Sequence, residues 1–171
     1  MKANTAIKKS CQRLELFLRQ NKFCSDGIID ERDVQCLLYH FCVDYFKSPE
    51  KIHAEYNLPK SRRRVDLYLK SRRGGLAIEI KLFNYGMTRG LKRWKEKEKV
   101  FFTDIHKMGK LNAKHKRKSW FILFIKSIGD EVEKNEVFLK KVKRECKRCN
   151  VIFRQIPQII NEETKRMKLY S

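Results

Sequence analysis

The sequence has few of the residues that divide a chain into separate modules. Its three prolines and seven glycines are scattered, so no Pro/Gly-rich linker is present. No segment is repeated and none is low in complexity. A chain of 171 residues usually forms one domain, and we therefore expect a single domain over residues 1–171.

Long apolar runs are also missing. Charged residues make up 36% of the chain, and no stretch approaches the roughly 20 apolar residues that a membrane helix needs. The first ten residues are basic and polar, without the apolar segment of a signal peptide. We expect no membrane association and a reduced, intracellular setting in the cytoplasm, in which the six cysteines are free thiols.

Acidic residues are in the minority. There are 20 Asp and Glu against 41 Lys and Arg, which gives a net charge of +21 spread along the whole chain. Such a charge attracts polyanions and makes association sensitive to salt. A ribosome or an acidic membrane would be attracted too, but no amphipathic anchor is present. Nucleic acid is therefore the favoured partner.

Apolar periodicity predicts an α/β fold. Helices are expected over residues 7–20, 31–46, 88–114 and 130–150, and strands over residues 51–58, 64–70, 76–83, 120–126 and 151–156. This order predicts a mixed sheet flanked by helices, with the first strands antiparallel and the later ones reached by helical crossovers. The core spans about 28–126, the C-terminal helix and strand 130–156, and a short basic tail follows.

Charged residues interrupt two adjacent strands of this predicted sheet. Side chains alternate along a strand, so Glu79 and Lys81 share one face of residues 76–83. A hairpin across Gly74 and Gly75 can bring Asp66 of the preceding strand next to Glu79. A Glu-x-Lys pair alone is more often a solvated ion pair. Two carboxylates beside a core instead favour a hard cation such as Mg²⁺, because unpaired buried charge is costly.

Asp66 followed by Glu79-Ile80-Lys81, within an αβββαβ order of elements, resembles the PD-(D/E)XK nuclease superfamily with its restriction-endonuclease-like fold. The resemblance covers residues 28–126. Val65 stands where the family motif has proline, and the helix over residues 88–114 has no glutamine in its first turns.

The resemblance implies a metal-dependent hydrolysis of phosphodiester bonds. Asp66, Glu79 and the Ile80 carbonyl would hold Mg²⁺, with Mn²⁺ as a substitute, and Lys81 would orient or deprotonate the attacking water and stabilise the developing charge. Glu31 resembles the acidic residue that many members place near the metal. It is equally interpreted as compensation of the helix dipole at an N-terminus.

The function that this implies is a DNA endonuclease of restriction, repair or recombination type. Cutting both strands with one site per chain requires two chains, so a homodimer or a partner subunit in a larger nuclease complex is implied. Two other classes compete with it: a non-catalytic nucleic-acid-binding protein that kept the fold, and a basic structural component of a larger particle. The presence of Asp66, Glu79 and Lys81 together favours the enzyme.

Four weaker signals remain open. Glu55 either reaches the site or covers a sheet edge. Lys107 either aids the site from the facing helix or lies on a solvated helix face, and the solvated face is the favoured expectation. The arginines of residues 62–64 and 72–73 either contact phosphates or solubilise turns. Cys146 and Cys149 form one CxxC without further ligands at zinc spacing, so we expect a thiol pair and not a metal site.

Overall fold

The computed structural model describes residues 2–20, 30–46, 48–58, 64–71, 74–84, 91–115, 119–126 and 132–157. The expected basic tail lies outside these residues, as do the arginine positions 62, 63, 72 and 73 and residues 21–29. The elements, in chain order, are α1 (Ala3–Gln20), α2 (Glu31–Tyr45), the 3-10 turn η2 (Pro49–Lys51), β1 (Ile52–Asn57), β2 (Arg64–Ser71), β3 (Gly74–Asn84), α3 (Leu91–His115), β4 (Ser119–Lys126), α4 (Val132–Arg148) and β5 (Ile152–Pro157).

The five strands form one mixed sheet in the order β1-β2-β3-β4-β5. The first three strands are antiparallel neighbours, whereas β3, β4 and β5 run parallel. Parallel neighbours need a crossover, and α3 and α4 supply it. The predicted α/β class, the αβββαβ order and the mixed sheet flanked by helices are confirmed.

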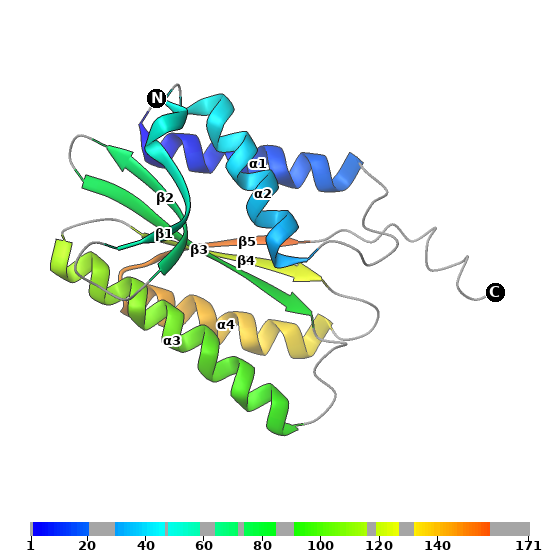
Figure 1. Cartoon of the computed structure of the whole chain (residues 1–171). Coiled ribbons are helices and arrows are strands. Elements are labelled where there is room, and N and C mark those ends of the chain that lie inside the picture. The colour runs from blue at the N-terminus through cyan, green and yellow to red at the C-terminus, as the bar shows by residue number, and fades with distance from the viewer. Residues whose placement is uncertain are drawn as a thin grey trace.

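Helices cover both faces of the sheet (Figure 1): α1 and α2 lie on one face, α3 and α4 on the other. Each face therefore has its own apolar core. Ile78, Ile80 and Ile122 are buried under α1 and α2, and Ala77, Phe121 and Leu123 are buried against α3 and α4. This explains why β3 and β4 are apolar on both faces.

Local sequence fixes the start of α2, a helix that matters for the site. Asp30 is the N-cap of α2 and forms a capping box with Asp33, in which each side chain accepts a hydrogen bond from the other's backbone.

In the β2-β3 hairpin, a Cβ on Gly75 would come within 2.0 Å of the Tyr68 ring, so glycine is required there for close packing. None of the helices in the described segments has the length and apolar character that a membrane crossing demands.

Candidate active site

The candidate site lies where β2 separates from β3. Pairing of β2 with β1 continues to Arg64, but pairing of β2 with β3 runs only from Ser71–Gly74 to Leu67–Ile78. Residues two apart on a regular strand face the same side of the sheet. Val65 and Leu67 do not: Val65 packs in the α3/α4 core, and Leu67 packs under α1 and α2. β3 continues to Asn84, so part of its edge faces a gap instead of a strand.

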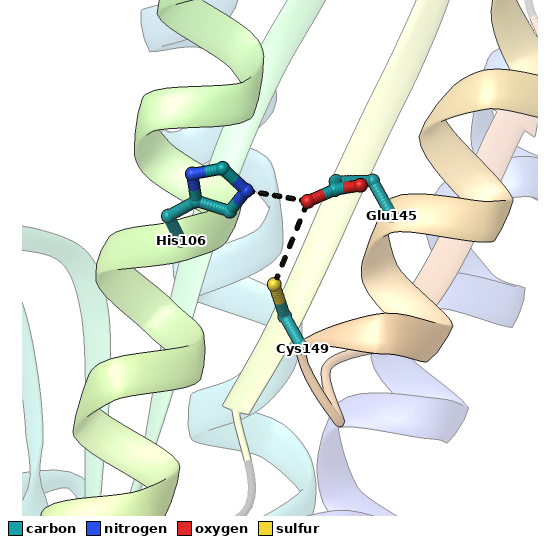
Figure 2. A group of neighbouring side chains, drawn as sticks. All are labelled: His106, Glu145 and Cys149. Carbon is teal, nitrogen blue, oxygen red and sulfur yellow. Dashed lines mark hydrogen bonds and ion pairs between the residues drawn. The ribbon is translucent and has the colours of Figure 1, made fainter.

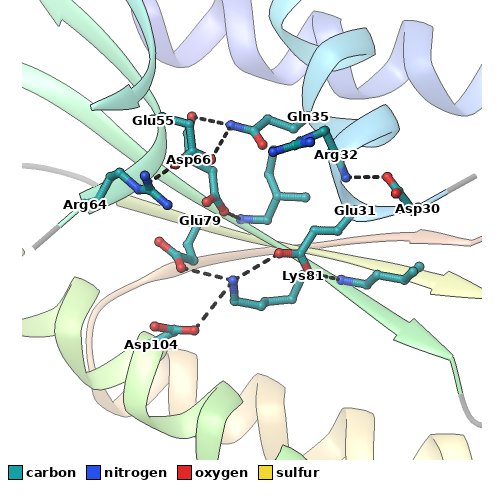
Figure 3. Close-up of polar contacts among 12 residues, drawn as sticks. Asp30, Glu31, Arg32, Gln35, Glu55, Arg64, Asp66, Glu79, Lys81 and Asp104 are labelled. Carbon is teal, nitrogen blue, oxygen red and sulfur yellow. Dashed lines mark hydrogen bonds and ion pairs between the residues drawn. The ribbon is translucent and has the colours of Figure 1, made fainter. Parts of the chain in front are cut away.

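Two carboxylates fill this gap by accepting hydrogen bonds from β3 (Figure 3). Asp66 Oδ2 accepts from the backbone N–H of Ile80 at 2.6 Å, and Glu31 Oε2 accepts from the N–H of Leu82 at 2.9 Å. These N–H groups would be orphaned at the strand edge without an acceptor. Asp66 and Glu31 thus replace the missing strand and are held against β3.

Glu31 is directed to β3 because other residues cap its helix. Asp30 and Asp33 satisfy the first N–H groups of α2, which leaves the Glu31 side chain available. Glu31 Oε1 lies 3.3 Å from Lys81 Nζ. The sequence left two interpretations of Glu31: a residue near the metal, or compensation of the helix dipole. In the structure its carboxylate lies within the site, in contact with Lys81 and β3.

Glu79 and Lys81 point to the opposite side of the gap, where α3 supplies two partners. Lys81 Nζ lies 3.2 Å from Glu79 and 3.7 Å from Asp104. Lys107 Nζ lies 2.8 Å from Glu79 and 3.2 Å from Asp104. Each lysine contacts both carboxylates, so Glu79, Lys81, Asp104 and Lys107 form a closed charge ring.

The charge ring is largely shielded from solvent. The Glu79 side chain is 5% exposed, and those of Lys81, Lys107 and Asp104 are 17%, 15% and 18% exposed. The expectation that Lys107 lies on a solvated helix face is therefore wrong. α3 packs against the face of β3 that carries Glu79, which turns Lys107 inward. Asp104 was not singled out from the sequence.

A hollow of about 450 Å³ opens beside Asp66 on the α2 side. Gln35 Nε2 donates to the Asp66 carbonyl at 3.0 Å and to Glu55 at 3.1 Å. Glu55 also pairs with Arg64 at 2.5 Å and adopts a positive φ of 50°, an uncommon conformation for a non-glycine residue. Glu55 therefore lines the hollow, and Gln35, which was not predicted, fixes the Asp66 backbone.

Burial shifts the acid-base behaviour of the two strand carboxylates. Burial raises the pKa of Asp66, and Lys81 and the Ile80 hydrogen bond oppose this only in part. Burial, followed by the neighbouring Asp66 charge, raises the pKa of Glu79 to about 7. Asp66, which is half-buried, and Glu79, which is buried, repel each other and therefore gain from a nearby cation.

Lys81 is held in its charged form. Burial lowers its pKa, but the carboxylates of Glu79, Asp66, Glu31 and Asp104 more than offset burial and raise the pKa above its ordinary value. Lys81 is consequently a fixed ammonium group at neutral pH. It is suited to stabilising negative charge and poorly suited to accepting a proton from water.

The donors beside the gap fit a hard divalent ion. Asp66 and Glu79 offer carboxylate oxygens. The N–H and C=O of one strand residue face the same neighbour, so the Ile80 carbonyl faces the gap into which its N–H donates. Lysine ammonium groups neutralise Glu79 in this arrangement, and a metal ion would share or replace their contacts.

Comparisons with known proteins add little. No family model matches the chain, and no curated protein matches it. One solved structure with some likeness is SfsA of Pyrococcus furiosus in complex with Ca²⁺, at 15% sequence identity and a TM-score of 0.45. The match covers 76% of this chain and 58% of SfsA, so the chain spans less than two thirds of that protein. The PD-(D/E)XK resemblance thus remains a prediction.

Proposed function

We propose that this chain is a divalent-metal-dependent nuclease of the PD-(D/E)XK type that hydrolyses phosphodiester bonds in DNA. The observation that carries the proposal is the grouping of Asp66, Glu79 and Lys81 with Glu31 where β2 separates from β3. Asp66 and Glu31 line the open hollow, and Lys81 links Glu31 to Glu79, so the group provides both carboxylate ligands for a metal and a cation for a phosphate.

Asp66, Glu79 and the Ile80 carbonyl are the proposed ligands of Mg²⁺, with Mn²⁺ as a substitute. When bound, the ion would polarise the scissile phosphate and lower the pKa of a bound water. The donor set matches this choice because all of its atoms are oxygens. Glu31 lies on the far side of Lys81 from Glu79 and is proposed to position that lysine, since its two oxygens hold Lys81 Nζ and the Leu82 N–H.

Lys81 is the proposed catalytic cation. Its raised pKa keeps it protonated, so it would stabilise the negative charge that develops on the phosphate during hydrolysis and orient the water by hydrogen bonding. Deprotonation of the water, the other role expected for Lys81, is not part of this proposal, because a lysine with a raised pKa is a poor general base. Asp104 and Lys107 would hold Glu79 and Lys81 in place from α3.

DNA is the proposed substrate on grounds of charge. The net charge of +21 provides attraction for phosphates that does not depend on sequence. One site per chain cuts one strand, so a double-strand break would require a homodimer or a partner subunit.

A second candidate is a non-catalytic nucleic-acid-binding protein. The observation that favours it is the charge ring itself, because Lys81 and Lys107 neutralise both oxygens of Glu79 without a metal ion. A protein that had lost catalysis would keep such a ring for stability. The two candidates make opposite predictions about cleavage and the same prediction about binding.

A cleavage assay on plasmid and single-stranded DNA tests the proposal. The protein is incubated with Mg²⁺, with Mn²⁺ or with a chelator, and Asp66→Asn serves as the matched variant because it keeps the shape and an acceptor oxygen. We expect cleavage by the wild-type protein only with metal, and none by the variant, while both bind DNA. Binding without cleavage in either metal would favour the second candidate.

A further inference from the structure

Three side chains of different chemistry meet between α3 and α4, away from the charge ring. Figure 2 shows His106 of α3 facing Glu145 of α4 and Cys149 just beyond the end of α4. One ligand atom from each residue lies within 4.8 Å of the others. The two cysteines of the CxxC lie in different surroundings. Cys146 is buried in the core, whereas Cys149 is half-buried and faces the other two residues.

One oxygen atom is the focus of this cluster. Glu145 Oε1 contacts His106 Nε2 and lies 3.9 Å from Cys149 Sγ. Arg148 also donates to the same oxygen through Nε at 3.0 Å and Nη2 at 2.5 Å. Four polar atoms therefore crowd around one carboxylate oxygen, more than its lone pairs accept well.

The backbone around Cys149 is fixed against α3. A Cβ on Gly109 would lie 2.8 Å from the Cys149 Cβ, so glycine allows this close approach one turn after His106. α4 ends in a Schellman motif: Val151 N–H donates to the Cys146 carbonyl, and Asn150 adopts a positive φ of 53°.

A side chain of α3 also holds this end of α4. The Asn112 amide donates to the Asn150 carbonyl at 2.6 Å. Close packing at Gly109 and this hydrogen bond together place the Cys149 thiol beside His106. They do not depend on the polar cluster itself.

We propose that His106, Glu145 and Cys149 bind a divalent transition-metal ion of the zinc class, with water in the fourth position. One imidazole, one carboxylate and one thiolate are ligands that Zn²⁺ accepts, and the two anionic ligands balance its charge. The C-terminal end of α4, at which Cys149 lies, also favours a cation.

Side-chain movements would complete the site. Tetrahedral ligands at ordinary zinc bond lengths lie about 3.3 to 3.6 Å apart. Cys149 Sγ would therefore move a few tenths of an ångström closer to Glu145, while the His106 and Glu145 side chains, now in direct contact, would have to separate to admit the ion. Arg148 must leave; its side chain is 69% exposed and can turn into solvent.

The zinc ion would clamp the helix that supplies half of the charge ring. Asp104 and Lys107 lie on either side of His106 in α3, so a fixed α3 keeps both residues against β3. The hard-oxygen site beside β3 and this nitrogen, oxygen and sulfur site differ in ligand type. Their metal requirements should be separable.

The competing explanation is an interhelical ion-pair cluster that binds no metal. The two explanations differ most clearly at Arg148. In a zinc site Arg148 competes with the metal, so Arg148→Ala should tighten metal binding severalfold. In an ion-pair cluster the same change only removes a favourable contact.

The test is titration of the full-length, chelator-treated protein with Zn²⁺ and with Co²⁺ as a spectroscopic probe. We expect stoichiometric binding, a rise in thermal midpoint and a thiolate-to-cobalt charge-transfer band. Cys149→Ser should lose the band, and Cys36→Ser, which changes an exposed thiol elsewhere, should keep it. His106→Ala should weaken metal binding, whereas Cys36→Ser should bind the metal as the wild-type protein does.

Two results would overturn the proposal. One is failure of both the wild-type protein and Arg148→Ala to bind Zn²⁺ or Co²⁺. The other is an unchanged cobalt band in Cys149→Ser. Because Arg148→Ala leaves all three ligands intact, the proposal remains testable even if Cys149→Ser folds poorly. Neither result bears on Mg²⁺-dependent cleavage.

Discussion

The carboxylate of Asp66 accepts a hydrogen bond from the backbone N–H of Ile80 at 2.6 Å, across the point where their strands part. The contact satisfies a strand-edge donor that has lost its neighbour. It also holds the carboxylate within the gap that the Ile80 carbonyl faces. The same side chain thus supports the sheet and offers an oxygen to a metal ion, and substitutions can separate these two roles.

Replacement of Asp66 should separate stability from catalysis. Asp66→Asn keeps an acceptor for the Ile80 N–H and removes the charge. Asp66→Ala leaves that donor unsatisfied, which costs about 1 to 3 kcal/mol of unfolding free energy. We expect both variants to lose metal-dependent cleavage and only the alanine variant to lose substantial stability. DNA affinity should stay within severalfold because it depends on distributed charge.

Denaturant unfolding, cleavage and DNA-binding assays on the two variants provide the measurement. Full cleavage by either variant would rule out Asp66 as a metal ligand. Equal stability losses in both would show that the Ile80 hydrogen bond does not need an acceptor at this position.

The raised pKa of Glu79 predicts how stability depends on pH. Its pKa is about 7 in the folded protein against an ordinary value of 4.5, so the folded state holds the proton more tightly than the unfolded state. The stability of the metal-free protein should therefore fall as pH rises through this window. Glu79→Gln cannot ionise and should lack this contribution.

The measurement is the unfolding free energy of both proteins in a chelating buffer at several pH values. The difference between the two proteins gives the contribution of Glu79 ionisation to stability. We expect the wild-type stability minus that of Glu79→Gln to decrease between pH 4.5 and about 7. A difference that increases would mean that Lys81 and Lys107 outweigh the cost of burying the charge.

Much of the fold follows from the sequence because apolar periodicity reports burial directly. The strands over residues 64–70, 76–83 and 120–126 were predicted close to their observed bounds, as was the helix over residues 31–46. Alternation along β3 also placed Glu79 and Lys81 on one face. These features depend on neighbours in the sequence.

The residues that were not predicted depend on packing between elements. Gln35 is an ordinary helix residue until α2 lies over the end of β2, where its amide meets the Asp66 carbonyl. Asp104 and Lys107 look like one face of a charged helix, and only the docking of α3 turns them toward Glu79. The separation of β2 from β3 has no sequence signal beyond Asp66 itself.

Lys107 provides a test of the charge ring. Loss of its ammonium group in Lys107→Met should raise the pKa of Glu79 further, because a cation that favours the ionised carboxylate is gone. The pH profile of cleavage should then shift to more alkaline values. Lys110→Met, an exposed lysine of the same helix, removes the same charge and should leave the profile unchanged. Identical profiles for both variants would contradict the coupling of Lys107 to Glu79.

The most direct test of the account is single-turnover cleavage by Lys81→Met at saturating protein and Mg²⁺. The variant keeps much of the side-chain stem and deletes the charge; Lys97→Met deletes the same charge from an exposed position on α3. If Lys81 stabilises charge that develops in the transition state, its loss should slow cleavage by ~100-fold or more with little change in DNA affinity. Lys97→Met should cut at the wild-type rate. A near-wild-type rate for Lys81→Met would contradict the assignment of this site as the catalytic centre.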